Sequence, residues 1–88
     1  MYYVYIIYSS GTDRYYKGIT QNVEKRVAEH NKGLSRYTKD KGPWELVYLK
    51  AAGDKSSALI EEKRLKRLNR QSIIKIVSGN SGNNQAQV

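Results

Sequence analysis

The spacing of apolar side chains predicts a β-hairpin at the start of this chain. Residues 2–8 are aromatic or β-branched throughout, a composition that favours a strand over a helix. A polar loop with Gly11 and Thr12 comes next, and residues 15–20 supply a second short extended run. We therefore expect two antiparallel strands that turn near Gly11 and Thr12.

A first helix is predicted after the hairpin. Thr20 and Asn22 are both suited to cap its start, and Val23 and Val27 repeat at the i,i+4 spacing of one helical face. Gly33 marks the point where this pattern stops.

The middle of the chain predicts a loop and a third strand. Residues 34–43 are mostly polar and basic and end in Gly-Pro, which is typical of a loop. Residues 44–49 place their side chains in two alternating sets that begin with Trp44 and Glu45, so they are expected to form a strand.

Two more helices are predicted beyond the third strand. Asp54 or Ser56 can cap a helix that continues to Arg70. Ser72 can cap a short third helix over residues 73–77.

These elements follow one another in the order ββαβαα, which predicts an α+β fold with a small three-stranded antiparallel sheet flanked by helices. Residues 1–78 are expected to form one domain, because a chain of 88 residues is too short for two. Residues 79–88 contain no charged side chain, so we expect a disordered tail there.

The composition narrows the range of functions. The chain has no cysteine, which excludes disulfides, thiolate metal sites and cysteine nucleophiles. Its first apolar run is too short for a membrane span and lacks the basic lead of a secretory signal, so we expect a cytoplasmic protein. We expect a monomer or a weak homodimer, although no sequence feature predicts a dimer. A formal charge of +8 favours nucleic acid as partner over a charge that serves only solubility.

Tyrosines are the first candidates for chemistry, because the chain has eight of them and no phenylalanine. If the hairpin turns near Gly11, Tyr16 lies opposite Ile7 and diagonal to Tyr5, at a Cα spacing of ~7–8 Å. Both hydroxyls can then reach one small ligand. Alternatively, each is an ordinary strand residue with an apolar ring and a solvated hydroxyl.

The first helix offers an arginine and the only histidine of the chain. Arg26 and His30 border the stripe formed by Val23 and Val27. A guanidinium suits phosphate, and a neutral imidazole can accept a proton or orient water near pH 7. A histidine near a helix C-terminus is alternatively a surface residue that compensates the helix dipole.

The second helix combines cations with carboxylates. Glu61 and Glu62 fall within its apolar arc, so each needs a cation or a metal ion as partner, and periodicity does not choose between them. Pairing with Arg64 or Lys66 is the simpler alternative to a metal. The cations expected to bind nucleic acid are Lys17, Lys63, Lys66, Arg67 and Arg70.

Together these residues resemble the GIY-YIG nuclease superfamily. The runs YVY at residues 3–5 and YYKG at residues 15–18 are similar to the two motifs that name it, and Arg26 and His30 stand where the family keeps an arginine and a following histidine or tyrosine. Over residues 2–77 the chain resembles the small stand-alone bacterial UPF0213-like subfamily.

The motifs also depart from the family pattern at two positions. Tyr3 stands where the first motif has Gly, and Lys17 stands where the second has Ile. Tyr5, Tyr16 and Gly18 match, so the residue types that carry the family's chemistry are present.

The resemblance implies a metal-dependent endonuclease that hydrolyses phosphodiester bonds in DNA, of the kind used in repair or recombination, with RNA as an alternative substrate. Glu62 would hold one Mg²⁺ or Mn²⁺. Arg26 would stabilise the charge of the five-coordinate phosphorus. Tyr5, Tyr16 or His30 would position or deprotonate the attacking water.

Two other classes of function fit the same composition. One is a non-catalytic nucleic-acid-binding module with a degenerate nuclease site, which would use the same basic surface. The other is a protein-interaction domain whose positive charge meets an acidic partner.

Overall fold

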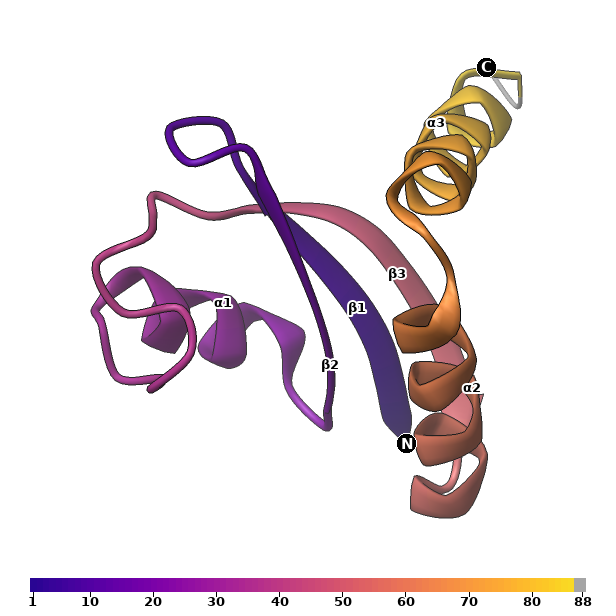
Figure 1. Cartoon of the computed structure of the whole chain (residues 1–88). Coiled ribbons are helices and arrows are strands. Elements are labelled where there is room, and N and C mark those ends of the chain that lie inside the picture. The colour runs from indigo at the N-terminus through magenta and orange to yellow at the C-terminus, as the bar shows by residue number, and fades with distance from the viewer. Residues whose placement is uncertain (87–88) are drawn as a thin grey trace.

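The computed structural model describes the backbone of residues 1–86 and the side chains of residues 1–79 (Figure 1). Its elements confirm the predicted order ββαβαα and the α+β class. They are β1 (Tyr2–Ser9), β2 (Arg14–Thr20), α1 (Val23–Asn31), β3 (Glu45–Gly53), α2 (Lys55–Arg67) and α3 (Arg70–Ala86).

The strands form one antiparallel sheet in the order β2-β1-β3, so the first strand lies in the middle. Tyr16 pairs with Ile7, which is the register predicted from a turn near Gly11, and Gly18 pairs with Tyr5. Because side chains alternate between the two faces of a strand, Tyr5 and Tyr16 lie on the same face of the sheet.

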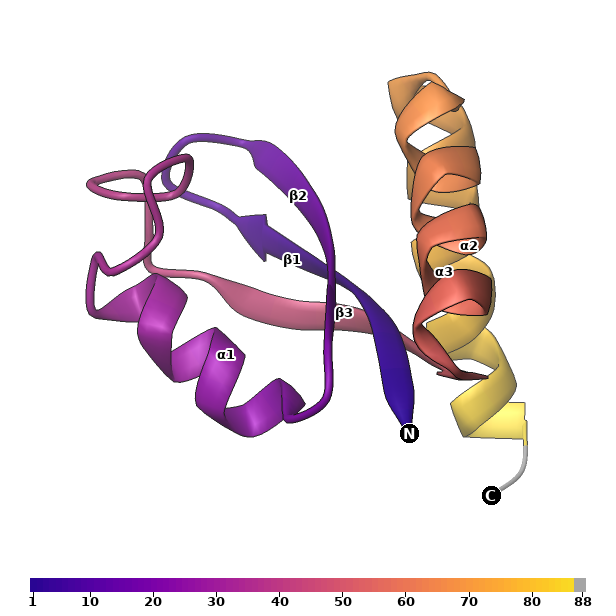
Figure 2. The ribbon, with the colours of Figure 1, turned by 90° about the horizontal axis from the view of Figure 1, so that it is seen from below.

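Both faces of β1 are buried, which explains its unbroken apolar run. On one face Val4 and Ile6 pack against α2 and α3. On the other face Tyr5 and Ile7 pack against α1 and Trp44. Figures 1 and 2 show α1 on one side of the sheet and the other two helices on the opposite side. A strand covered on both faces has no position that favours a polar side chain.

The first two helices begin at predicted caps. The Asn22 side chain accepts a hydrogen bond from the Lys25 backbone N–H at 3.1 Å, which caps α1. The Asp54 carboxylate accepts one from the Ser57 backbone N–H at 2.8 Å, which caps α2. In each case the side-chain oxygen satisfies a backbone donor that has no partner within the helix.

The junction between α2 and α3 differs from the prediction. α2 ends at Arg67, and Arg70 is the first residue of α3 instead of the last residue of the second helix. Asn69, and not Ser72, caps α3, because its side chain accepts a hydrogen bond from the Ser72 backbone N–H at 2.9 Å and its carbonyl accepts one from Ile73 at 3.1 Å. The predicted row of cations is therefore divided between two helices.

α3 continues to Ala86, through most of the segment 79–88 that was expected to be a disordered tail. Nucleating a helix is costly, whereas extending one adds a hydrogen bond for each residue ordered, so apolar residues that start a helix can be followed by polar ones. Residues 87 and 88 lie outside the described residues, and a domain boundary near residue 78 stays a prediction. Neither α3 nor another described helix has the length and apolar character needed to span a bilayer.

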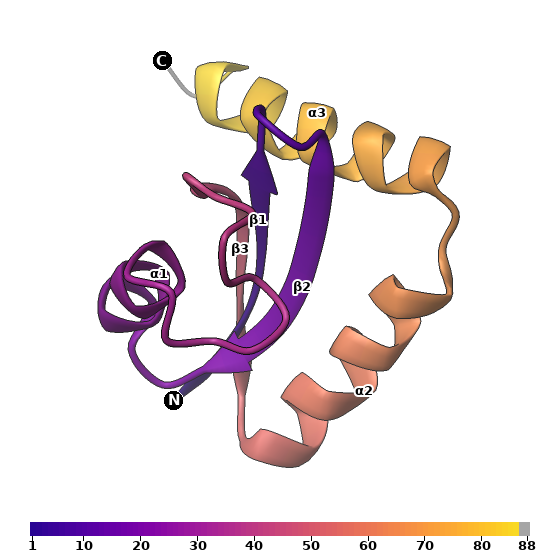
Figure 3. The same cartoon turned by 60° about the vertical axis from the view of Figure 1, so that its left-hand side comes forward.

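The outer edge of β2 lies between two groups of elements. Figure 3 shows α1 and the loop that follows it on one side of β2, and α2 and α3 on the other. Side chains from both faces of the sheet can therefore meet around this edge.

Gly18 is required because the ring and hydroxyl of Tyr5 lie directly over it. A Cβ atom at position 18 would lie 2.5 Å from Tyr5 Oη and 2.7 Å from Tyr5 Cζ, and the buried ring has no room to move away. We expect Gly18→Ala to lower the free energy of unfolding by about 1–3 kcal/mol, measured by urea denaturation. Gly11→Ala is the control, because a Cβ there meets nothing closer than 4.0 Å. Equal stability of the two variants would contradict this account of Gly18.

Candidate active site

Two tyrosines from neighbouring strands converge on the α1 face of the sheet. The centroids of the Tyr5 and Tyr16 rings lie 6.5 Å apart. Tyr5 in the central strand is only 1% exposed, whereas Tyr16 on the edge strand is half-buried and lines a cleft described below. The two phenols therefore differ in their access to solvent and to a substrate.

His30 joins this pair from the last turn of α1. Its ring centroid lies 5.9 Å from that of Tyr5 and 5.0 Å from that of Tyr16. Tyr5 Oη and His30 Nε2 are hydrogen-bonded at 2.8 Å, and His30 Nδ1 and Thr38 Oγ1 at 2.7 Å. Because His30 is buried and both ring nitrogens have partners, the alternative of a surface histidine that compensates the helix dipole is wrong.

The loop between α1 and β3 holds Thr38 against His30. Thr38 is buried, and its backbone carbonyl accepts a hydrogen bond from Trp44 Nε1 at 3.1 Å. The Asn31 side chain accepts a hydrogen bond from the Trp44 backbone N–H at 2.6 Å and donates to the Trp44 carbonyl at 3.1 Å. The sequence did not indicate Thr38, because a loop has no periodicity. The one available signal was Trp44, a large ring that must be buried next to a polar segment.

Burial determines the ionisation of both partners in the Tyr5–His30 hydrogen bond. Removal from water raises the pKa of Tyr5 to about 12, although the nearby Arg26 guanidinium acts in the opposite direction. Burial, reinforced by the positive charge of Arg26, lowers the pKa of His30 to about 4. At neutral pH a neutral phenol therefore faces a neutral imidazole.

Arg26 lies one turn before His30 on α1. Its Nη1 donates a hydrogen bond to Glu29 Oε1 at 2.9 Å, and a third of its side chain is exposed. The hydrogen bond to Glu29 raises the pKa of Arg26, burial opposes this, and the Tyr5 hydroxyl adds a further increase. A charged guanidinium thus lies between the buried tyrosine and the solvent.

α2 brings a carboxylate toward the same edge from the opposite side of the sheet. Glu62 Oε2 lies 3.4 Å from Lys66 Nζ, and its side chain is only 15% exposed. Burial is the main cause that raises the pKa of Tyr5, and the negative charge of Glu62 also raises it, so the two side chains lie within electrostatic range.

The two glutamates of α2 differ in how fully their oxygens are occupied. Glu61 accepts hydrogen bonds from Arg64 at 2.9 and 2.7 Å and from Lys50 at 3.5 Å, and the Arg64 contact lowers the pKa of Glu61. Among the described residues Glu62 has only the longer contact to Lys66. A carboxylate with open lone pairs fits a hard cation that takes its other ligands from water and substrate.

No group of three His, Cys, Asp or Glu side chains suited to a metal ion gathers in the described part of the chain. A metal ion at this edge would therefore rest on fewer than three such side chains, and Glu62 is the carboxylate with open lone pairs. Mg²⁺ accepts such a site, because it commonly keeps several waters and binds through one or two carboxylates.

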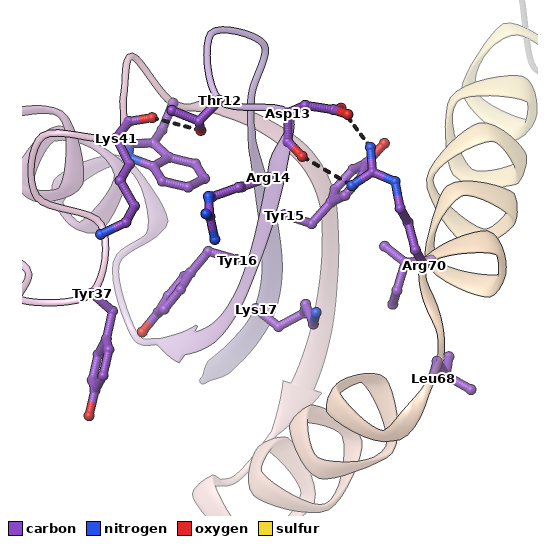
Figure 4. A pocket seen from close by; sticks show the side chains of 12 residues that line it. Thr12, Asp13, Arg14, Tyr15, Tyr16, Lys17, Tyr37, Lys41, Leu68 and Arg70 are labelled. Carbon is purple, nitrogen blue, oxygen red and sulfur yellow. Dashed lines mark hydrogen bonds and ion pairs between the residues drawn. The ribbon is translucent and has the colours of Figure 1, made fainter.

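A basic cleft of about 570 Å³ lies along β2, next to Tyr16 (Figure 4). The loop between α1 and β3 forms one wall, and the start of α3 forms the other. Burial lowers the pKa of Lys17 in this cleft, and the charge of Lys66 adds to the effect. The lining cations are Arg14, Lys17, Lys41 and Arg70.

The predicted site residues fall into three groups. Tyr16, Arg26 and His30 gather around Tyr5, and Glu62 approaches from α2. Of the predicted nucleic-acid ligands, Lys17 and Arg70 line the cleft and Lys66 contacts Glu62. The remaining two, Lys63 and Arg67, are exposed on α2 and do not line the cleft.

Comparison with known proteins gives consistent matches over most of the chain. Residues 1–75 match the family model described as the GIY-YIG catalytic domain. A UPF0213 protein of Natronomonas pharaonis is 38% identical over 82 residues, which cover 92% of this chain and 95% of that protein. A UPF0213 protein of Halobacterium salinarum is 43% identical over 72 residues, or 80% of this chain and 91% of that one.

A solved structure resembles the fold as well. The solution NMR structure of a UPF0213 protein from Bacillus halodurans superimposes with a TM-score of 0.56 at 34% sequence identity. The match covers 89% of this chain and 84% of that one, so it extends over nearly all the elements described above.

The buried His30 predicts a specific acid response. As the pH falls, the unfolded chain binds a proton at His30 near its ordinary pKa of ~6.5 and the folded chain does so near 4. The stabilisation is therefore complete above about pH 6.5, and about 2–3 kcal/mol of it is lost by pH 4. Because His30 is the only histidine, its imidazole proton NMR shifts report the titration directly. A midpoint near 6.5 would contradict the buried, doubly hydrogen-bonded ring.

Proposed function

This chain belongs to the GIY-YIG catalytic domain family, and from that premise we propose that it is an endonuclease that hydrolyses phosphodiester bonds in DNA with a bound divalent metal ion. The observation that carries the proposal is the gathering of Tyr5, Tyr16, His30 and Arg26 on the α1 face of the sheet, beside a basic cleft and with Glu62 of α2 within electrostatic range of Tyr5. Phosphoryl chemistry needs such a combination of a cation, a carboxylate and groups that orient water.

Arg26 is suited to stabilise the negative charge that builds up on the phosphorus centre. Its guanidinium is charged, partly buried and already held by Glu29, so little reorganisation is needed when a phosphate arrives. A planar fork of N–H donors also matches the geometry of phosphate oxygens.

Tyr16 is the group best placed to orient the attacking water. His30 has both ring nitrogens in hydrogen bonds and a lowered pKa, which makes it a poor general base. Tyr5 is buried and its pKa is raised, so it stays a neutral phenol. We therefore assign His30 and Tyr5 to positioning and Tyr16, which reaches the cleft, to contact with water and substrate.

Glu62 is the proposed ligand of the metal ion, Mg²⁺ or Mn²⁺. Its carboxylate is mostly buried, lies within electrostatic range of Tyr5 and has open lone pairs. A bound divalent ion supplies positive charge to the phosphate and the leaving oxygen. Lys66 contacts Glu62 and lies near Lys17. Both lysines add positive charge for phosphate oxygens on the α2 side.

Replacement of Glu62 tests the proposed activity. We expect Glu62→Gln to abolish Mg²⁺-dependent nicking of supercoiled plasmid while DNA affinity stays within about threefold, because one neutralised carboxylate removes the metal ligand but none of the phosphate contacts. Glu61→Gln is the matched control and should retain cleavage. Cleavage by Glu62→Gln would refute the metal assignment. A wild-type protein that binds DNA but never cleaves it would be a binding module only.

Replacement of Arg26 tests the transition-state role. Arg26→Ala should lower the single-turnover cleavage rate by ~10²-fold or more, because a cation aimed at developing charge acts mainly on the chemical step. Lys25→Ala, an exposed neighbour on the same helix, is the control. If Arg26→Ala weakens only DNA binding and leaves the rate at saturation unchanged, Arg26 belongs to the binding surface instead.

A further inference from the structure

The basic cleft beside β2 is larger than the proposed reaction at Tyr16 requires, and most of its lining residues have no role in that reaction. Its volume of about 570 Å³ lies in the range of sites that enclose a small molecule or a few units of a polymer. Trp44, Leu68 and Ile73 also line the cleft among the cations, and of these three side chains only Leu68 is more than slightly exposed. A nucleotide fits such a lining, because its flat base can contact the uncharged side chains and its phosphate can contact the cations.

The cations of the cleft come from separate segments and surround a path along β2. Arg14 and Lys17 belong to β2, Lys41 to the loop between α1 and β3, and Arg70 to α3. Figure 4 shows Lys41 on the loop side of the cleft and Arg70 on the opposite side. Arg70 is held in place by Asp13, whose carboxylate and carbonyl oxygens accept hydrogen bonds at 2.6 and 3.0 Å.

Tyr37 is the one aromatic side chain of this cleft that is mostly exposed. It is 72% exposed, and no other described ring or side chain has a hydrogen bond or stacking contact with it. In contrast, Tyr15 packs on Tyr8 with ring centroids 4.7 Å apart, and Tyr16 packs near His30. An apolar ring left open beside cations is a ready surface for stacking a base.

The backbone beneath Tyr37 is already ordered. Its neighbour Thr38 is buried and hydrogen-bonded both to His30 and, through its carbonyl, to Trp44. A ring attached to a fixed backbone loses little entropy when a ligand binds it. Tyr37 is therefore anchored by the same network that positions the candidate catalytic residues.

We propose that this cleft receives an unpaired nucleic-acid strand, with one base stacked on Tyr37 and its phosphates on Arg14, Lys17 and Lys41, so that the substrates are single-stranded or contain single-stranded segments. The assignment of the strand to the active site rests on the proposed nuclease function. In a duplex the faces of the bases are stacked on one another, so only an unpaired base can present its face to a tyrosine.

A binding experiment without cleavage tests the cleft directly. Fluorescence anisotropy with a labelled 12-nucleotide DNA strand, in EDTA, should give tighter binding than the same strand annealed to its complement. Tyr37→Ala should weaken single-strand binding about tenfold and leave duplex binding unchanged, because stacking is lost only for unpaired bases. Tyr37→Phe keeps the ring and should bind like the wild type.

The salt dependence of binding identifies the phosphate contacts. Lys41→Ala should reduce the slope of log affinity against log salt by about 0.7 for the single strand, whereas Lys55→Ala, an exposed lysine at the start of α2 outside the cleft lining, should leave it unchanged. Equal effects of these two variants would overturn the proposed strand path.

The proposal also falls if the wild type binds duplex as tightly as single strand, or if Tyr37→Ala weakens both equally. Because binding is measured with the metal removed, these outcomes do not depend on activity. Cleavage that requires Glu62 but shows no preference for unpaired DNA would leave the nuclease function standing and remove only the single-strand site.

Discussion

The hydrogen-bonded chain from Tyr5 through His30 to Thr38 joins the central strand, the first helix and the loop that follows it. All three side chains are buried, so each polar atom depends on the next for the partner that water would otherwise supply. The position of the loop wall, and with it Tyr37, follows from this chain. The loss of one link would leave a buried polar group without a partner, which costs more than the bond itself contributes.

The same chain makes the core and the candidate active site one structure. A domain of this size buries little surface, so it has few buried residues that belong to the core and not to the candidate site. Tyr5 fills the α1 face of the sheet with its ring and carries its hydroxyl over Gly18 to His30, and this arrangement fixes the residue opposite as glycine. Residues of the candidate site are therefore also residues that stabilise the fold.

The open edge of β2 gives the site its polarity. On the α1 side Tyr16, His30 and Arg26 are arranged around Tyr5. On the α2 side Glu62 and Lys66 carry opposite charges. The neighbouring cleft adds cations from three segments, so part of the positive charge of the chain is concentrated at one place.

Local patterns in the sequence were sufficient for the order of the elements, the hairpin register and the candidate residues, because strand and helix periodicity depend on neighbouring side chains. They did not give the end of α2 or the bounds of α3. The pairing of Ile7 with Tyr16 followed from the turn alone. Arg26 was a candidate from its place beside the apolar stripe of its helix, whereas the choice of Glu62 over Glu61 came from the family resemblance. Only the tertiary structure decided that His30 is buried with a lowered pKa, that Thr38 holds it, and that Arg70 faces a cleft. The first two depend on a loop brought against a helix, and the last on how α3 packs against the sheet. Such long-range contacts leave no periodic trace in the chain.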